Sequence, residues 1–296
     1  MIKKSILLII LILPVVLAGL ETQKEAIQGD VIRELNEPAY IRLILTNTGE
    51  SDTFEIYTLV SGMDILPRYN FPIEAGEKKE LEVEVRTSSD VRKNYGDYKF
   101  LYNIRGQQTG VTEDTMTIRI LPFEEALEII PLDISLGDQF AKVKIKNNAD
   151  FWFHDFKIRF ESVLFNYETS FELEPKKEKT IEIPLGNVDG KSAGSYILRV
   201  SFLKGDVVER FDSDIRYLEK SSIDTTNRVN GFFVLKIEIE KVNNGNIPTV
   251  ASIETDRNII SRLFTKLGSN PDSVKREGFA VYYSWNEELE PGEKLA

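Results

Sequence analysis

A single histidine and no cysteine leave this 296-residue chain few side chains that could do nucleophilic or thiolate chemistry. Thiol catalysis and Cys/His metal sites need residues that the chain lacks, and any Ser-His-Asp triad would have to use His154. That histidine lies among aromatic residues, and no Gly-x-Ser-x-Gly segment is present to supply a nucleophile elbow. We therefore expect no catalytic residues, no cofactor and no enzymatic activity.

Carboxylates are the one reactive group that the chain has in quantity, with 48 Asp and Glu residues. Glycoside hydrolysis needs only two carboxylates, and calcium takes carboxylate and carbonyl oxygens as ligands. The clusters that could offer such ligands are 212–214 (Asp-Ser-Asp) and the loop 186–190 (Gly-Asn-Val-Asp-Gly). Neither matches a full calcium-loop pattern, and ordinary turn chemistry explains both. We expect no metal site.

Aromatic residues are the remaining group that could recognise a ligand. Phe151, Trp152 and Phe153 follow one another in the sequence and form a candidate aromatic contact patch, on which sugar rings could stack. A run of this kind more often divides its side chains between a core and a junction of modules. Both interpretations stay open from the sequence.

The charge of the chain limits its partners. Its net charge is −11, and it becomes −13 if Lys3 and Lys4 leave with a signal peptide. An acidic chain lacks the basic patches that neutralise phosphate groups, so we expect no nucleic-acid partner. The same balance argues against docking on anionic lipid headgroups.

The N-terminus has the pattern of an export signal. Lys3 and Lys4 precede a fourteen-residue apolar run, Ser5–Ala18, and small residues permit cleavage between Ala18 and Gly19. The run is shorter than the roughly 20 residues of a membrane-spanning helix. We predict a signal peptide over 1–18, with an uncleaved N-terminal anchor as the alternative.

Internal repetition indicates how the chain is organised. Three segments share one plan, in which an alternating strand, an asparagine-rich turn and a further strand lead to a turn flanked by glutamates. The spacing from Asn47 to Glu74 is 27 residues, and the spacing from Asn147 to Glu174 is also 27. The alternating strands that open the plan are Ala39–Thr46, Ala141–Lys146 and Leu235–Lys241.

The predicted strands alternate between apolar and charged residues. In Lys79–Arg86, for example, Leu81, Val83 and Val85 would point to one face and the charged residues to the other. A sheet with one buried face and one solvent-exposed face is typically antiparallel. Short strands in units of about 100 residues are typical of immunoglobulin-like sandwiches. We predict an all-β chain of tandem immunoglobulin-like antiparallel β-sandwiches, with modules over 21–121, 122–219 and 220–296 and a polar link over 220–230.

A Gly-x-Tyr sequence opens a late strand in each of the first two modules, at Tyr98 and at Tyr196. In immunoglobulin-like sandwiches a tyrosine near the start of a late strand donates a hydrogen bond to nearby backbone, which is called a tyrosine corner. We name both residues as candidate tyrosine corners. A tyrosine that simply faces the core would give the same pattern, and this alternative stays open.

The third module differs in length from the other two. Its spacing from Asn243 to Glu290 is 47 residues rather than 27, so about twenty residues are inserted. We predict a helical insert over about 256–277, whose helix has Asp256 as its N-cap and is ended by Gly268. The residues on its apolar face would be Ile259, Ile260, Leu263, Phe264 and Leu267.

The same spacing predicts that the third module is incomplete. Only three residues follow Glu293, whereas 43 residues separate the equivalent Glu77 from Ile120 in the first module. The third module would therefore lack its last strands and leave open sheet edges. We expect the chain to be a fragment of a longer protein that continues beyond Ala296.

The turn sequences carry a family resemblance. Asn47–Gly49, Glu74–Glu77 and Gly96–Tyr98 resemble prokaryotic immunoglobulin-like surface repeats, including the cell-adhesion-related domain of bacteria and archaea and the domain found beside α-galactosidase modules. The second module departs from this pattern at Asn148-Ala149 and at 175–177. The third module resembles the membrane-proximal region of archaeal surface proteins that end in a transmembrane anchor. The resemblance implies architecture and surface location only.

From these observations we expect a non-enzymatic structural or interaction protein that is secreted or lies on the extracellular face of the cell membrane. Its partner would be an envelope protein or a glycan. Attachment to the membrane would use the N-terminal signal or anchor, or a C-terminal helix beyond Ala296. The alternative is a carbohydrate-binding accessory region of a larger secreted enzyme.

Overall fold

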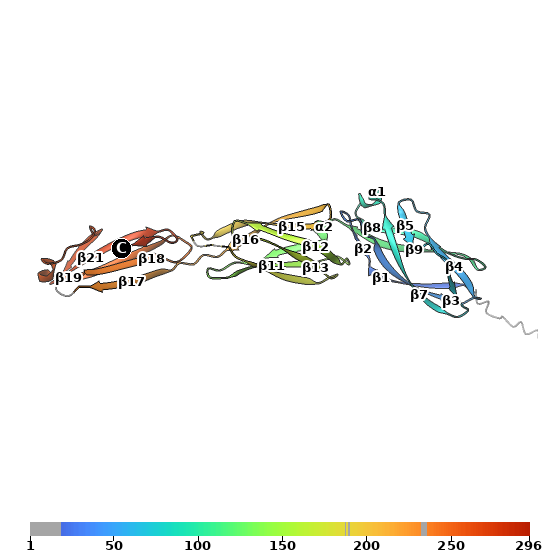
Figure 1. Cartoon of the computed structure of the whole chain (residues 1–296), viewed down its shortest axis with the longest axis horizontal. Coiled ribbons are helices and arrows are strands. Elements are labelled where there is room, and N and C mark those ends of the chain that lie inside the picture. Colours follow the sequence, from blue (N-terminus) through green and yellow to red (C-terminus); the bar gives the residue numbers. More distant parts are fainter. Residues whose placement is uncertain (1–18, 187, 189, 232–235) are drawn as a thin grey trace, which may run out of the picture. The chain divides into compact units, whose positions relative to one another are not determined.

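The computed structural model describes residues 19–186, 188, 190–231 and 236–296 (Figure 1). In this part of the chain there are 22 strands and three helices of four residues each, which confirms the prediction of an all-β chain. The backbone divides into two compact units. One ends at Ala126 and also takes in Asn148–Trp152, and the other comprises Leu127–Asn147 and Phe153–Ala296.

Two sheets form the first module, whose strands are β1–β9. The first sheet has the strand order β1-β3-β7-β5, with bounds Leu20–Gln28, Ala39–Asn47, Lys78–Thr87 and Met63–Leu66. The second has the order β2-β9-β8-β4-β6, with bounds Asp30–Ile32, Gly110–Leu121, Gly96–Gly106, Asp52–Tyr57 and Phe71–Ile73. Two short helices, α1 and α2, span Ser89–Arg92 and Phe123–Ala126.

The core of the first module lies between its two sheets. Every second residue of β3 is buried, from Ala39 to Asn47, because alternate side chains of a strand point to opposite faces. Leu43 and Val83 of the first sheet share one hydrophobic cluster with Phe54 and Ile104 of the second. The module is therefore a two-layer β structure with a continuous core.

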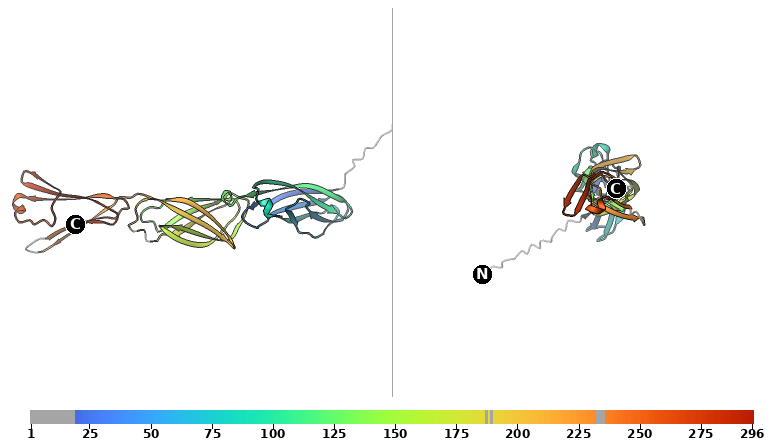
Figure 2. Two further views of the ribbon diagram at one scale, coloured as in Figure 1. Left: turned by 90° about the horizontal axis from the view of Figure 1, so that it is seen from above. Right: turned by 90° about the vertical axis from the view of Figure 1, so that its left-hand side faces the viewer.

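The second module repeats this two-sheet plan with strands β10–β16. One sheet has the order β10-β11-β14, with bounds Leu127–Pro131, Phe140–Asn147 and Glu178–Pro184. The other has the order β13-β12-β15-β16, with bounds Phe165–Leu173, Phe153–Ser162, Gly194–Lys204 and Val207–Tyr217. These strands can be followed from above in Figure 2, in green to orange. The side chains of Phe156, Phe160 and Phe202 are buried to 2% exposure or less.

The third module has strands β17–β22. One sheet has the order β17-β18-β22, with bounds Ile223–Asn230, Lys236–Asn243 and Lys294–Leu295. The other has the order β19-β21-β20, with bounds Thr249–Asn258, Ala280–Leu289 and Ser273–Glu277. Of the predicted opening strand, Leu235 lies outside the described residues.

The helix predicted from Asp256 to Gly268, within the insert over about 256–277, is wrong for most of its length. The helix α3 spans only Ile259–Arg262, and its N-cap is Asn258, whose Oδ1 accepts a hydrogen bond of 2.7 Å from the backbone N–H of Ser261. Asp256 is instead the third-last residue of β19 and pairs with β21. The apolar residues had the spacing of a helix face, but a helix is stabilised mainly by burying that face. Ile260, Leu263 and Phe264 are exposed, and Ile259 and Leu267 are only partly buried.

The predicted polar link over 220–230 is also mostly a strand. Ile223–Asn230 forms β17, which pairs along its whole length with β18. The residues before it are held by the buried Asn246, whose Oδ1 accepts a hydrogen bond from the Lys220 N–H and whose Nδ2 donates one to the Leu218 carbonyl, both 2.7 Å. The boundaries predicted at 121 and 219 stay predictions.

A buried asparagine ends the second long strand of each module, and in the first module it is Asn47, which is 1% exposed. Its N–H donates to the Glu77 carbonyl at 3.0 Å, and its own carbonyl accepts from the Gly76 N–H at 2.8 Å. Its side-chain Nδ2 donates to the Ile73 carbonyl at 3.1 Å, while Oδ1 accepts from the Gly49 N–H at 3.0 Å. One side chain thus ties two distant turns together.

The third module reproduces this linkage around Asn243, which is fully buried. Its N–H donates to the Glu293 carbonyl at 3.0 Å, and its carbonyl accepts from the Gly292 N–H at 2.8 Å. Its Nδ2 donates to the Leu289 carbonyl at 2.8 Å, and its Oδ1 accepts from the Gly245 N–H at 2.9 Å. Four hydrogen bonds of the same kind therefore connect the same two turns in both modules.

The second module keeps the linkage but has lysines in place of the glycine and the following glutamate of the turn. Asn147 donates from its N–H to the Lys177 carbonyl at 2.8 Å and from its Nδ2 to the Glu174 carbonyl at 2.9 Å. Lys176 has φ 58° there, at the position where the other two modules have glycines with φ 73° and 85°. The left-handed conformation is therefore retained although its residue is not glycine, which costs about 1 kcal/mol or more.

Candidate interaction surfaces

The two candidate tyrosine corners differ. Tyr196, in β15, donates a hydrogen bond of 2.5 Å from its hydroxyl group to the backbone carbonyl of Ser192, four residues upstream. This is the hydrogen bond that defines a tyrosine corner. Tyr98, in β8, is half-buried against the core of the first module, and no hydrogen bond of its hydroxyl group is found among the described residues. Tyr98 therefore fits the alternative of a core-facing aromatic.

The predicted aromatic contact patch does not exist as a continuous surface. Phe151 and Phe153 are fully buried, and only Trp152 between them is exposed, to 47%. The Trp152 N–H donates to Oε1 of Gln28 at 3.1 Å. The run divides between core and surface because adjacent side chains point in opposite directions, so a single ring remains that a ligand could reach.

His154 follows this run and contacts a neighbouring carboxylate. Its Nδ1 lies 2.7 Å from Oδ2 of Asp155, which is 83% exposed in its side chain and has φ 57°. The hydrogen bond to His154 lowers the pKa of the Asp155 carboxyl group. A histidine paired with an exposed carboxylate at the start of a strand is a surface ion pair, and surface pairs contribute little to stability.

The carboxylate clusters that could have held calcium have other partners or lie partly outside the described residues. Asp212, in β16, forms an ion pair of 3.0 Å with Nε of Arg199 on the neighbouring strand. Two residues of the loop 186–190 are not described. In the part of the chain that the structure covers, no group of three or more His, Asp and Glu side chains is arranged to hold a metal ion.

An ion pair between a buried carboxylate and a partly exposed arginine, which sequence reasoning missed, lies in the first compact unit. Asp30 is 4% exposed, and its carboxylate accepts two hydrogen bonds from the Arg119 guanidinium group, of 3.0 and 2.5 Å. The same carboxylate accepts from the Asp150 N–H at 2.6 Å, and Asp150 in turn accepts from the Gly29 N–H at 3.0 Å. Because these polar groups satisfy one another, the cluster is structural rather than open to a ligand.

Asp52 has a comparable structural role at the turn between β8 and β9. Its carboxylate is nearly buried and accepts hydrogen bonds from the backbone N–H groups of Gln107, Gln108 and Thr109, of 2.9 to 3.1 Å. Burial raises the pKa of the carboxyl group, but the hydrogen bonds from Thr109 and Gln108 outweigh this effect and lower the pKa to about 2. Asp52 therefore stays ionised and fixes this turn.

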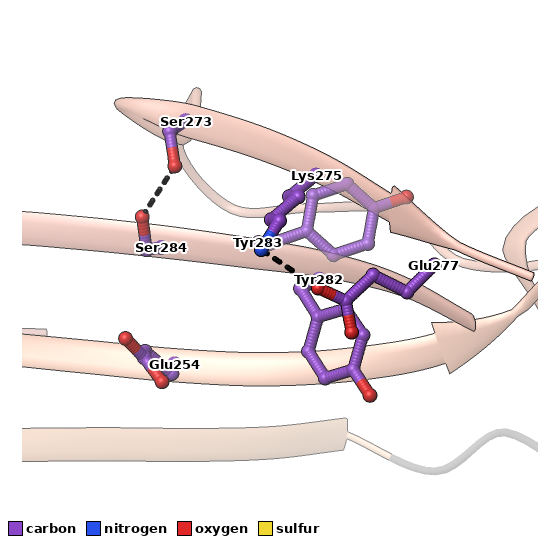
Figure 3. Close-up of a pocket in the computed structure, with 7 residues that line it drawn as sticks. All are labelled: Glu254, Ser273, Lys275, Glu277, Tyr282, Tyr283 and Ser284. Atoms are coloured by element: carbon purple, nitrogen blue, oxygen red, sulfur yellow. Dashed lines mark hydrogen bonds and ion pairs between the residues drawn. The ribbon is translucent and has the colours of Figure 1, made fainter.

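A shallow polar pocket of about 310 Å³ lies on the sheet β19-β21-β20 (Figure 3). Glu254, Ser284 and Ser273 face one another across the three strands, and the two serine Oγ atoms are 2.8 Å apart. The register places Lys275 opposite Tyr282. Hydroxyl and carboxylate groups beside an exposed tyrosine ring can bind a polar ligand such as a sugar.

The pocket was not foreseen because Ser273, Lys275 and Glu277 were placed in a helical insert rather than on a strand. Lys275 Nζ lies 2.7 Å from Oε1 of Glu277, and this hydrogen bond raises the pKa of the lysine ammonium group. Tyr282 is 41% exposed, whereas Tyr283 is 5% exposed and belongs to the small core of the module. The alternation of side chains along 280–285 could have indicated the pocket, since neighbouring strand residues such as Tyr282 and Tyr283 point to opposite faces of the sheet.

A second pocket, of about 440 Å³, lies in the first module beside β7. Its charged groups already have partners: Nε of Arg86 lies 2.5 Å from Oε1 of Glu84, and Nη1 of Arg92 donates to the Leu35 carbonyl and to Oδ1 of Asn36, both at 2.8 Å. Side chains that pair with one another leave little binding capacity for a ligand.

Among the described residues, the third module has fewer buried apolar side chains than the first. Ile237 of β18 lies six residues before Asn243, as Ile41 of β3 lies six residues before Asn47, yet Ile237 is 48% exposed and Ile41 is 4% exposed. Among the described residues β19 pairs only with β21, whereas its counterpart β12 pairs on both sides. One edge and one face of the third module are therefore accessible.

No helix in the described part of the chain combines the length and the apolar character that a membrane crossing requires.

Comparisons with known proteins give no family for this chain. No protein-family model and no curated protein matches it. Among solved structures it is similar to the YadV chaperone, with 11% identity, a TM-score of 0.25 and coverage of 66% of this chain and 98% of the chaperone. The E. coli chaperone DraB is similar with 10% identity, a TM-score of 0.26 and coverage of 65% and 96%.

A third similar structure is a protein of unknown function from Porphyromonas gingivalis W83, with 15% identity, a TM-score of 0.25 and coverage of 66% of this chain and 99% of that one. Scores this low carry no argument about function, so the proposals that follow rest on the residues of this chain.

Proposed function

We propose that this chain is a non-enzymatic protein of the cell surface or the extracellular space, built from immunoglobulin-like modules that organise or bind envelope components. The observation that carries the proposal is the repeated asparagine linkage, which connects the same two turns in three successive segments. Repeated modules of this kind provide spacing and contact surfaces rather than a reaction centre.

The strand orders support the immunoglobulin-like part of the proposal. In constant-type immunoglobulin domains one sheet has the order A-B-E-D and the other contains C, F and G. The first sheet of the first module, β1-β3-β7-β5, corresponds to A-B-E-D, and β4-β8-β9 of the second sheet correspond to C-F-G. In the second module, β10-β11-β14 correspond to A-B-E and β12-β15-β16 correspond to C-F-G.

The location outside the cytoplasm is supported by the sequence of the N-terminus. Lys3 and Lys4 before the apolar run Ser5–Ala18 are typical of an export signal. The absence of enzymatic activity is supported by composition, since a single histidine and no cysteine leave few catalytic arrangements open.

The lack of native cysteine permits a direct test of location. We would introduce one cysteine, Val163→Cys, at a position 65% exposed, and treat intact cells with a membrane-impermeant maleimide. The matched control is Val143→Cys, a fully buried valine that should react only after denaturation. Labelling of Val163→Cys on intact cells supports the proposal, and labelling only after lysis contradicts it.

A carbohydrate-binding accessory region is the second candidate function. The observations that favour it are the exposed ring of Trp152 and the pocket that combines Tyr282 with the hydroxyl groups of Ser273 and Ser284. Glycan-array binding by the whole protein should fall on Trp152→Ala or on Tyr282→Ala, while Tyr69→Ala, at an exposed ring elsewhere, should leave it unchanged. Absence of binding to any glycan rules out this candidate.

A further inference from the structure

Four large apolar side chains of the third module are almost completely exposed. Ile260, Leu263, Phe264 and Phe279 are 73%, 80%, 85% and 85% exposed. Side chains so exposed have almost no neighbours to support them, so they protrude from the surface. We call these four residues the loop patch.

The loop patch is brought together by the fold rather than by sequence. Phe279 lies in the turn between β20 and β21, and its carbonyl accepts a hydrogen bond of 3.0 Å from the Ile259 N–H at the start of α3. The other three residues lie in α3 or within two residues of its end, where backbone hydrogen bonds fix the turn: Leu263 N–H donates to the Ile260 carbonyl at 3.1 Å. The backbone therefore places the turn that carries Phe279 beside the start of the turn that carries the other three residues.

The segment that carries the loop patch has a net positive charge although the chain as a whole is acidic. Residues 256–280 contain five Lys and Arg and three Asp and Glu, which gives a local net charge of +2, against −11 for the whole chain. Arg262 and Lys266 lie within the patch segment and are exposed. The negative charge of the rest of the chain is screened beyond the Debye length of about 8 Å in physiological salt.

We propose that the loop patch inserts into the interfacial region of a lipid bilayer that contains anionic headgroups. Protruding apolar and aromatic side chains next to Lys and Arg are the combination that binds membrane interfaces, where the rings enter the acyl boundary and the cations remain at the phosphates. A fluid acyl layer accommodates protruding side chains without a shaped complement, whereas a protein partner would need a matching pocket for each. The inference goes beyond the proposed function, which names no lipid contact.

Vesicle flotation tests the proposal with residues 19–296, from which the apolar run Ser5–Ala18 is absent. This chain should bind vesicles that contain phosphatidylglycerol and bind pure phosphatidylcholine vesicles more weakly. Phe264→Ser together with Phe279→Ser should weaken binding by about tenfold or more, because two rings no longer leave water. Arg262→Glu together with Lys266→Glu should weaken binding to the anionic vesicles only.

A local probe separates insertion at the patch from adhesion elsewhere. Phe264→Cys carrying an environment-sensitive fluorophore should shift its emission to shorter wavelength when vesicles are added, while Val163→Cys, in the turn between β12 and β13, should not shift. Since the replaced side chains are exposed, circular dichroism should show that Phe264→Cys and Val163→Cys both fold. Absence of vesicle binding, an unchanged emission at position 264, or undiminished binding of the double serine variant would each overturn the proposal.

Discussion

The first and third modules have the same hydrogen-bonded framework but differ in how much apolar surface they bury. Asn47 and Asn243 are both buried and make matching hydrogen bonds to the turns that contain Gly76 and Gly292. Glu77 and Glu293 even accept equivalent hydrogen bonds in their turns, of 2.7 and 2.9 Å.

The two modules differ in the burial of their apolar side chains. The first module has a continuous core in which Ile41 and Leu43 of β3 pack between two sheets. In the third module the equivalent Ile237 is half-exposed, and the largely buried apolar residues among those described are Ala251, Ile253, Val281, Tyr283 and Leu289. The comparison indicates that turn chemistry specifies the topology, whereas burial supplies most of the stability. Each prediction below tests either the contribution of the turns or the contribution of burial.

The largest expected difference is in the core. Ile41→Ala should lower the free energy of unfolding of the first module by about 3 kcal/mol, and Ile237→Ala should lower that of the third by about 1 kcal/mol or less, because Ile237 gives up little burial. Trp152 and Trp285 are the only tryptophans. Trp152 belongs to the segment Asn148–Trp152 of the first compact unit, and Trp285 lies in β21 of the third module. Urea unfolding of Trp285→Phe variants therefore reports on the first unit, and urea unfolding of Trp152→Phe variants reports on the third module. Equal losses would contradict the comparison.

The asparagine linkage should matter equally in both modules. Asn47→Ala and Asn243→Ala should each cost about 2 kcal/mol, because the Ile73 and Leu289 carbonyl groups lose their donors. The same single-tryptophan measurement applies. Asn166→Ala, at an exposed asparagine of β13, is the control and should change stability by less than about 0.5 kcal/mol. A loss in only one of the two modules would show that the framework is not shared.

Acid should destabilise the first module through Asp52. Its pKa in the folded state, about 2, lies below the ordinary value of 3.8 for an aspartate carboxyl group. The unfolded chain therefore binds the proton first, and the contribution of Asp52, about 2 kcal/mol, is present above pH 4 and disappears as the pH falls from about 4 to about 2. Asp52→Asn should remove this part of the pH dependence of the urea midpoint. An unchanged acid slope in the variant would refute this role.

The smallest expected effect is a gain in the second module. Lys176→Gly should raise stability by about 1 kcal/mol, since glycine adopts φ 58° without the steric cost that lysine has. The reverse change, Gly292→Lys in the third module, should lower stability by a similar amount. Scanning calorimetry measures both. A destabilised Lys176→Gly variant would mean that the lysine side chain contributes more than the backbone strain costs.

The strands could be predicted from sequence because alternation in segments such as Lys79–Arg86 directly reflects one buried and one exposed face. The repeat could be predicted because Asn47 and Asn147 stand at equal distances from their glutamate turns. The family resemblance, the export signal and the incompleteness of the third module stay predictions.

What the sequence did not reveal depends on which residues meet in space. Asp30, Arg119 and Asp150 are far apart in the chain and carry no local pattern. The helical prediction for the segment 256–277 was wrong because apolar residues at helical spacing form a helix only if another surface covers them. The pocket around Tyr282 was missed because the residues of its strand β20 were placed in the same helical insert.

Amide hydrogen exchange tests most directly whether the third module repeats the framework while leaving one face accessible. After correction for intrinsic rates, we expect the amides of β3 and β11 to exchange at least about a hundredfold more slowly than those of β18, because apolar burial governs local opening. The N–H of Asn243 itself, which donates to the Glu293 carbonyl, should be the most protected amide of β18. Equal protection of β3 and β18 would contradict the account.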